Sequence, residues 1–513
     1  MKLGLFFGAG AEIAYGLPSG GKFAIELFRL DPTEEKQKLR EELQRINRFT
    51  AYATKWLPDK FWSKNLHAFG KSEFSSLIES SIENKKHRLI QRLGDFDTLA
   101  EAQFARLQFD EAALKTAYRA EFGKELGTEV YSQVIRLNAM LGEHGQIFGS
   151  RYYSALLDVL RAHPEATLLK RFAVSFLQLL VGSCGHDLIS RLNQEIFSEA
   201  PDDLPIFDDV AGLFRVEMSK GGLDAIDLLI TERTDFNAIE NPTLVDMLCA
   251  LARGVLEALF DGILDYQALI DNHFRYLFAP KTEWAKFTKM VIFMRLARTY
   301  IVSQMPADDA LPGEGYYHDL AKANDLDIEL GAIGTSNYNS LLERFAGDLG
   351  FELPETFYLN GGVTDYYNPY TNDVVNADTP EEVPADQLHV PFILTQSGLK
   401  PLTSVSMSRR YVELFDQFTQ CDALAVVGFG FNTDDSHING LFRKLVEEHG
   451  KTLFWVRPAN GQTKDQIKSE LLEKLRLSEA NRGRIAPVAV DRNNREVDGE
   501  IWLKAIADEY LIT

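Results

Sequence analysis

Short apolar runs at the two ends of the chain predict β-strands. Residues 3–7 form the first run, and the glycines Gly8 and Gly10 follow it directly. Such runs, bounded by turn residues, are typical of buried strands. Six similar runs occupy the last third of the chain, at residues 329–335, 356–359, 390–395, 423–428, 452–456 and 485–490.

The middle of the chain has a different pattern. From about residue 32 to about residue 325, apolar positions recur with the helical period and strand signals almost vanish. Residues 34–49 place Leu39, Leu43 and Ile46 on one stripe of a charged helix, and residues 282–304 predict another helix. We therefore expect a large helical body here.

The arrangement of these elements predicts an α/β fold. Strands that alternate with helices form a mostly parallel, doubly wound, Rossmann-like sheet. The C-terminal strands lack an opening strand–helix unit, and residues 1–31 supply one. We predict one domain made from residues 1–31 and 326–513, split by a helical insert at 32–325.

Composition narrows the class of protein. A formal net charge of −21 argues against a sequence-independent grip on nucleic acid, which needs basic side chains to neutralise phosphates. Three scattered cysteines indicate a reducing compartment and exclude a four-cysteine zinc site. No apolar stretch is long enough to predict a membrane span. We expect a cytoplasmic protein with no metal and no membrane contact.

The first turn is a candidate phosphate site. Gly8, Ala9, Gly10 and Glu12 come directly after the first strand, where small residues let backbone N–H groups approach a pyrophosphate. A Gly-x-Gly after a strand is as often only a tight turn. The interpretation as a phosphate site is strengthened by Gly16, Leu17 and Pro18, which follow the turn within a few residues.

Three segments in this order resemble the sirtuin family. Residues 8–18 resemble its opening signature, residues 335–339 its Thr-x-Asn motif at a strand end, and residues 425–439 its closing strand, turn and helix. The resemblance covers about residues 1–30 and 325–460. It implies NAD binding by Gly8, Ala9, Gly10, Glu12, Pro18, Thr335, Ser336, Gly428, Gly430, Asp434 and His437.

The resemblance also implies a reacting centre. In the family, the asparagine that corresponds to Asn337 positions the water or the reacting ribose. Asparagine also tolerates turn backbone, so a turn-forming role for Asn337 stays open. Asp434 has a similar alternative, as a helix cap.

One position departs from the family pattern. Members that cleave NAD usually carry a His-Gly pair where this chain has Asn360-Gly361, and an asparagine cannot accept a proton near neutral pH. Asp365 lies five residues on and is a candidate catalytic replacement. Further candidates for that role are His318, His389 and His437 from other loops, and the pair Asp95 and Asp97 in the insert is a weaker one.

Paired CxxC motifs of a sirtuin zinc module are absent from the sequence, which makes protein deacylation the poorer hypothesis. Zinc-free members with a helical insert resemble bacterial anti-phage effectors, which cleave NAD to nicotinamide and ADP-ribose once a companion protein or nucleotide signal activates them. The resemblance therefore implies a regulated NAD hydrolase in a homo-oligomer or in a complex with an operon-encoded companion. The alternatives are a weakly catalytic NAD or ADP-ribose sensor and a scaffold for another nucleotide.

Overall fold

The computed structural model describes residues 1–17, 20–137, 142–183, 197–199, 218–264, 273–306, 313–393, 404–432, 435–459, 461–491 and 494–512. Its contacts divide the chain into two compact units. The first, which we call the sheet unit, contains Met1–Ser19, Leu30–Phe69 and Gln267–Thr513. The second, the helical unit, contains Gly20–Arg29 and Gly70–Tyr266.

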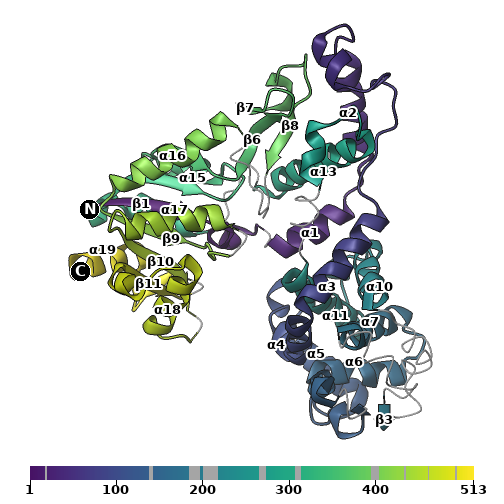
Figure 1. The fold of residues 1–513 in the computed structure, drawn as a ribbon. Coiled ribbons are helices and arrows are strands. Elements are labelled where there is room, and N and C mark those ends of the chain that lie inside the picture. Colours follow the sequence, from purple (N-terminus) through teal and green to yellow (C-terminus); the bar gives the residue numbers. More distant parts are fainter. Residues whose placement is uncertain are drawn as a thin grey trace. The chain divides into compact units, whose positions relative to one another are not determined.

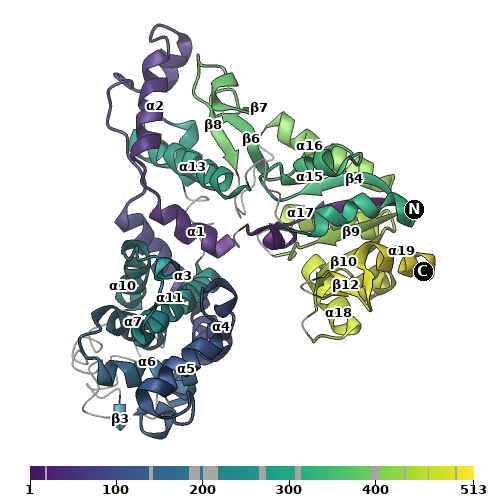
Figure 2. The ribbon, with the colours of Figure 1, turned by 180° about the vertical axis from the view of Figure 1, so that it is seen from behind.

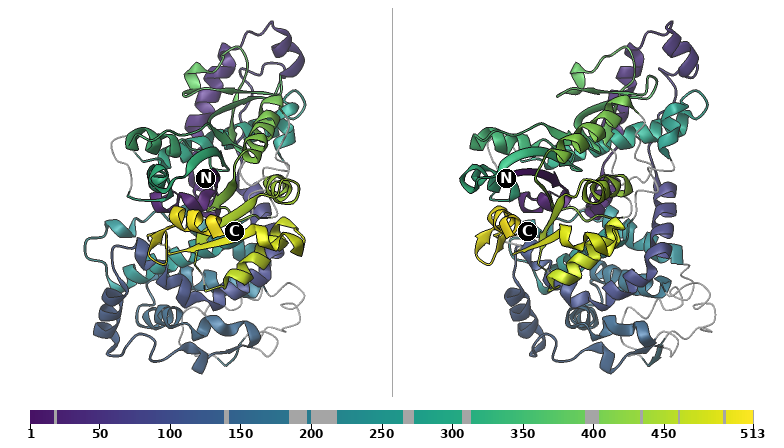
Figure 3. Two further views of the ribbon diagram at one scale, coloured as in Figure 1. Left: turned by 90° about the vertical axis from the view of Figure 1, so that its left-hand side faces the viewer. Right: turned by 60° about the vertical axis from the view of Figure 1, so that its left-hand side comes forward.

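A six-stranded, all-parallel sheet forms the core of the sheet unit (Figure 1). Its strands lie in the order β11-β10-β9-β1-β4-β5. When these six strands are numbered along the chain and the sheet is read from β5, this is the Rossmann order 3-2-1-4-5-6. Figure 3 shows the first strand among strands from the other end of the sequence. The strands are β1 (Lys2–Phe7), β4 (Glu329–Thr335), β5 (Thr356–Tyr358), β9 (Ala423–Val427), β10 (Thr452–Pro458) and β11 (Ile485–Val490).

The pairing of β1 confirms the prediction that the two ends of the chain share one sheet. Phe7 pairs with Thr335 of β4 on one side and with Val427 of β9 on the other. Both neighbours run parallel to β1, so the carboxyl ends of all three strands lie at the same edge of the sheet.

Helices cover both faces of this sheet (Figures 1 and 2). Side chains alternate along a strand, so Leu5 and Phe7 pack on one face and Phe6 on the other. The first face is covered by α15 (Leu341–Leu349) and α19 (Trp502–Ile512). The second is covered by α16 (Val405–Thr419), α17 (Ser436–Glu447) and α18 (Lys464–Leu475). The sheet is therefore doubly wound, as predicted.

A second, antiparallel sheet belongs to the same unit. It has the order β7-β6-β8, with β6 (Gly361–Asn368), β7 (Asp373–Asn376) and β8 (Val390–Ile393). The strand predicted at 390–395 exists as β8, but it lies here and not in the parallel sheet. The reason is pairing, because Val390 and Pro391 face Tyr367 and Tyr366 of β6. Alongside lie α2 (Thr33–Arg45) and α13 (Trp284–Gln304), which packs on both β8 and α2.

Helices dominate the helical unit. It contains α1 (Gly20–Arg29), α3 (Lys71–Gly94), α4 (Phe96–Glu101), α5 (Glu111–Phe122), α6 (Arg151–Ala162), α7 (Thr167–Ser183), α10 (Met218–Thr231) and α11 (Leu244–Ile263), with the short strands β2 (Arg136–Leu137) and β3 (Phe197–Glu199). No helix in the described ranges is both long and apolar enough to cross a bilayer.

The unit boundaries differ from the predicted insert at 32–325. Residues 30–69 and 267–325 belong to the sheet unit, and α1 belongs to the helical unit. Local contacts explain both differences. Arg298 of α13 donates to the Val363 carbonyl of β6 at 2.7 Å, and Tyr52 accepts a hydrogen bond from the Leu388 N–H at 2.9 Å. Arg29 of α1 pairs with Glu257 of α11 at 2.8 Å.

Candidate functional site

Three turns meet at the carboxyl ends of β4, β1 and β9. The Gly8 N–H donates to the Val427 carbonyl at 2.9 Å, and the Gly10 N–H donates to the Gly428 carbonyl at 2.8 Å. On the other side, the Ser336 N–H donates to the Phe7 carbonyl at 3.0 Å. The tertiary fold thus brings together the three segments on which the family resemblance depends.

The glycines of these turns are required by the contact between the turns themselves. A Cβ atom on Gly8 or Gly10 would lie 2.8 Å from the Gly428 carbonyl oxygen. Gly428 has a φ of +66°, which L side chains rarely adopt, and a Cβ there would collide with the Ala11 backbone nitrogen. Close packing of two turns is therefore sufficient reason for glycine, independent of any phosphate.

Most amides of the first turn are already used. The N–H groups of Gly8, Gly10, Ala11 and Glu12 all donate to backbone carbonyls. Ala9, at the tip of the turn, is exposed. The part of this turn that faces outward is therefore Ala9, and not the two glycines.

Glu12 lies in a buried polar cluster beneath the turn. Its Oε1 accepts a hydrogen bond from the Tyr317 hydroxyl at 2.7 Å, and its Oε2 accepts one from Asn339 Nδ2 at 2.8 Å. Only neutral donors stabilise this carboxylate, and burial raises its pKa to about 7. The family resemblance implied direct NAD contact for Glu12, but its carboxylate accepts hydrogen bonds from these two side chains.

Tyr317 and Asn339 are members of this cluster that were not predicted from the sequence. Tyr317 lies in α14 (Tyr316–Asp319), and burial together with the nearby Glu12 charge raises the pKa of its hydroxyl, which stays a donor. Asn339 is the last residue of the segment 335–339 that resembles the family's Thr-x-Asn motif, and this position is a signal that was available. No local pattern marks Tyr317.

Asn337 joins the cluster to the first turn. Its Nδ2 donates to the Gly8 carbonyl and to the Tyr317 hydroxyl, both at 3.2 Å. Its backbone N–H donates to Thr335 Oγ1 at 2.9 Å, and the Thr335 hydroxyl donates to the Phe7 carbonyl at 3.0 Å. The side chain is thus held in one orientation at the end of β4.

Two further asparagines at this edge carry buried oxygen atoms without a partner. Asn360 follows β5, and its Nδ2 donates to the Ser336 carbonyl at 3.4 Å. Asn439, in the first turn of α17, donates to the Asn432 carbonyl at 2.8 Å. The Oδ1 atoms of Asn360 and Asn439 accept no hydrogen bond within the described chain. Each is a buried acceptor that a ligand hydroxyl would satisfy.

Asp365 is not an available base. Both of its carboxylate oxygens accept hydrogen bonds from Arg410, at 2.6 and 2.7 Å, and the side chain is buried. Arg410 also donates to the Tyr358 carbonyl at 3.4 Å. A buried carboxylate in such a bidentate pair holds two elements together, and protonating it would break the pair.

The other base candidates are dispersed. His318 Nδ1 lies 3.5 Å from the Tyr15 hydroxyl, and burial lowers the pKa of its imidazole. His389 precedes β8, where burial likewise lowers the pKa of its ring. His437, in the first turn of α17, packs its ring against that of Tyr411. Asp95 and Asp97 belong to the helical unit, where Asp97 accepts a hydrogen bond from Ser150.

The remaining predicted contact residues are placed as follows. Gly430 is exposed, and its carbonyl accepts a hydrogen bond from Lys474 at 2.9 Å. Pro18 and Asp434 lie outside the described residues. Within the described ranges, no group of three or more His, Cys, Asp or Glu side chains is placed to hold a metal ion.

Comparison with known proteins gives no further guide. No model of a known protein family matches the chain, and no curated protein matches it in sequence. Its function must be inferred from the sequence pattern and from the geometry of this sheet edge.

Proposed function

We propose that this chain is a sirtuin-like, NAD-binding protein and a regulated NAD hydrolase. Its reaction consumes NAD and water and gives nicotinamide, ADP-ribose and a proton. The observation that carries the proposal is the convergence of the turns after β4, β1 and β9 at one sheet edge. The chain would deplete NAD in the cytoplasm during anti-phage defence, and it would act within an oligomer or together with a companion protein.

The strand order supports a dinucleotide as the ligand. In an open α/β sheet, ligands bind outside the carboxyl ends of the strands, where the strand order reverses. Here the reversal falls between β1 and β9, where the Gly8–Gly10 turn contacts Gly428. We place the pyrophosphate over the exposed Ala9 at the tip of that turn.

The unpartnered acceptors fit the ribose groups of NAD. Each ribose carries hydroxyl donors, and Asn360 Oδ1 and Asn439 Oδ1 are buried acceptors on either side of the turns. An unpaired buried acceptor costs roughly 1–3 kcal/mol, which a ligand hydroxyl would recover. These two amides therefore favour a ligand that is rich in hydroxyl groups.

Asn337 would position the attacking water. Because its Nδ2 is held by Gly8 and Tyr317, its Oδ1 is the end of the amide that remains for a water or a ribose hydroxyl. Cleavage of the nicotinamide bond passes through a cationic, oxocarbenium-like state, which a fixed amide dipole stabilises. The water must then lose a proton, and Asn360 cannot accept it.

A catalytically weak NAD or ADP-ribose sensor is the second candidate. The ion pair between Asp365 and Arg410 favours it, because this pair removes the nearest predicted base. In that case, the ligand would bind at the same sheet edge and tune a partner protein.

Nicotinamide release distinguishes the two functions. Purified protein is incubated with NAD, alone and with the protein encoded beside it in its operon, and nicotinamide is measured together with NAD binding. Release that depends on Asn337 would support the hydrolase. Binding without release under both conditions would support the sensor, and no binding would contradict both.

A further inference from the structure

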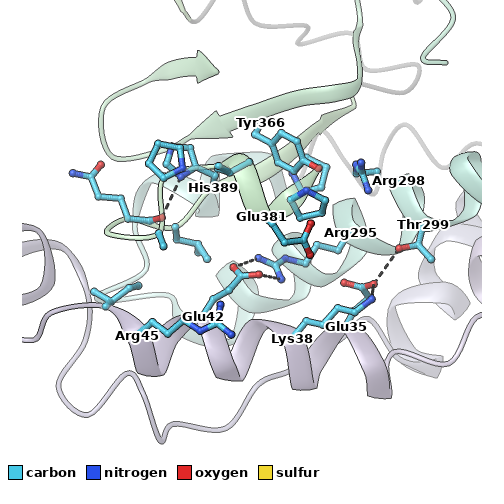
Figure 4. Close-up of a pocket in the computed structure, with 18 residues that line it drawn as sticks. Glu35, Lys38, Glu42, Arg45, Arg295, Arg298, Thr299, Tyr366, Glu381 and His389 are labelled. Carbon is cyan, nitrogen blue, oxygen red and sulfur yellow. Dashed lines mark hydrogen bonds and ion pairs between the residues drawn. The ribbon is translucent and has the colours of Figure 1, made fainter. Parts of the chain in front are cut away.

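A pocket lies away from the parallel sheet, within the sheet unit. It has a volume of about 210 Å³ and is lined by residues of α2, α13 and β6 and of the segment 380–391 (Figure 4). Dinucleotide and drug-sized ligands usually occupy pockets of about 300–1,000 Å³. The volume therefore suits a ligand smaller than NAD.

Four basic side chains, Lys38, Arg45, Arg295 and Arg298, and three acidic ones, Glu35, Glu42 and Glu381, line this pocket, which leaves one positive charge in excess. Arg295 is paired with Glu42 at 2.5 Å, and Lys38 is paired with Glu35 at 3.4 Å. Arg298 also lines the pocket, and no carboxylate in the described chain pairs with it. Its Nε donates to the Val363 carbonyl at 2.7 Å, which leaves the terminal nitrogens of the guanidinium for another acceptor.

Buried donors in the pocket also lack acceptors. The Tyr366 hydroxyl and Arg295 Nε are buried, with residue exposures of 4% and 8%, and neither has a hydrogen-bond partner in the described chain. The Arg298 guanidinium lies 5.4 Å from the centre of the Tyr366 ring. Figure 4 shows Tyr366, Arg298 and Arg295 around the same space, with Glu381 between Tyr366 and Arg295. A buried donor without an acceptor is costly, so this arrangement favours an occupant that accepts hydrogen bonds.

Apolar side chains form another part of the pocket lining. Ile46 of α2 and Leu388 line the pocket together with three prolines, Pro380, Pro384 and Pro391. Proline rings are rigid and carry no N–H donor, so they offer a fixed apolar surface. An occupant with both an anionic group and an apolar body could contact the donors and these apolar side chains together.

We propose that this pocket binds a small organic anion, a carboxylate or a phosphate monoester. Its anionic group would accept hydrogen bonds from Arg298, Tyr366 and Arg295, and its apolar body would lie against the prolines. Charge-assisted hydrogen bonds to arginine are among the strongest in proteins. This site is separate from the sheet edge that the proposed NAD hydrolase would use.

Calorimetry on the full chain, with no NAD present, tests the proposal. The probes are phenyl phosphate and benzoate, which share a flat apolar body and differ in the anion, with phenol as the neutral analogue. We expect at least one of the two anions to bind, and to bind more tightly than phenol. Which anion binds identifies the source, a phosphate ester or a carboxylate.

Matched variants locate the binding. We expect Tyr366→Phe, which keeps the ring under Arg298, and Arg298→Gln each to weaken binding of the anion roughly tenfold or more. The control is Tyr367→Phe, because Tyr367 is the next residue of β6, does not line the pocket and donates its hydroxyl to Asn372. The proposal is overturned if neither anion binds, if phenol binds as tightly, or if Tyr366→Phe and Arg298→Gln bind like the control.

Discussion

The edge of the parallel sheet and the pocket beside α13 both contain buried polar atoms without partners, but of opposite kinds. At the sheet edge these atoms are acceptors, Asn360 Oδ1 and Asn439 Oδ1. In the pocket they are donors, Arg295 Nε and the Tyr366 hydroxyl. Acceptors recognise ligand hydroxyl groups and donors recognise anions. One unit of the chain therefore offers two ligand chemistries.

The two regions also differ in how charge is held. Burial raises the pKa of the Glu12 carboxylate at the sheet edge to about 7, although the hydrogen bonds from the neutral donors Tyr317 and Asn339 oppose this rise. In the pocket, by contrast, charges are held in ion pairs, as between Arg295 and Glu42 at 2.5 Å. We therefore expect pH to change the ionisation of the sheet edge through Glu12.

The largest effect is expected from Gly428→Ala, which tests whether the turns at the sheet edge pack as closely as described. Alanine must adopt a φ of +66° and push against Ala11, so we expect the free energy of unfolding to fall by about 3 kcal/mol or more. Urea denaturation measures this loss. Gly440→Ala in α17, where a Cβ meets nothing within 4 Å, is the control and should not destabilise. Equal stability of the two variants would contradict the packing of the turns.

The second prediction concerns the pH dependence of Glu12. Its pKa rises from 4.5 to about 7 on folding, so between these values the folded chain binds more protons than the unfolded chain. Stability should therefore fall as pH rises from about 4.5 to about 7, by up to about 3 kcal/mol. In Glu12→Gln this decrease should be absent. Denaturation of both proteins at pH 5, 6, 7 and 8 measures the difference, and parallel curves would show that Glu12 does not titrate there.

Asn337→Ala should lower NAD cleavage about a hundredfold or more and leave NAD affinity largely intact. The reason is that Asn337 is proposed to place water, not to grip the ligand. Single-turnover rates and NAD titration separate these two quantities. Asn376→Ala on β7 is a control that should change neither. A variant with normal turnover would remove Asn337 from the mechanism.

The smallest effect is expected at Asn360. We expect weak NAD cleavage by the chain alone, and Asn360→His should raise this basal rate about tenfold because imidazole titrates near the working pH. Asn360→Gln is similar in bulk but cannot accept a proton, so it should not raise the rate. Nicotinamide release as a function of pH measures both. High basal turnover that is unaffected by either substitution would place the catalytic base elsewhere.

Local patterns predicted the main elements of this fold. The apolar run at 3–7 became β1, and the run at 423–428 became β9 at Ala423–Val427. The predicted helix at 282–304 is α13, at Trp284–Gln304. These predictions succeeded because buried apolar residues recur with the period of the helix or strand, and this recurrence can be recognised among residues that are close in the sequence.

Partners far apart in the sequence decided the rest. The sheet that β8 joins depends on pairing with β6, and β6 itself has no alternating pattern because nearly all of its residues are buried. Asp365 was predicted as a candidate base because its partner Arg410 lies 45 positions away in the sequence, and the ion pair forms only in the folded chain.

The sequence by itself determined that the first strand needed partners from the far end of the chain, and it marked the turns that meet there. Only the tertiary structure decided what surrounds their side chains. Asn337 touches Gly8 across 329 positions, and Glu12 meets Tyr317 across 305. Burial and hydrogen-bond partners set the chemistry of a polar group, and both are properties of the surroundings that folding creates, so residue type alone cannot reveal them.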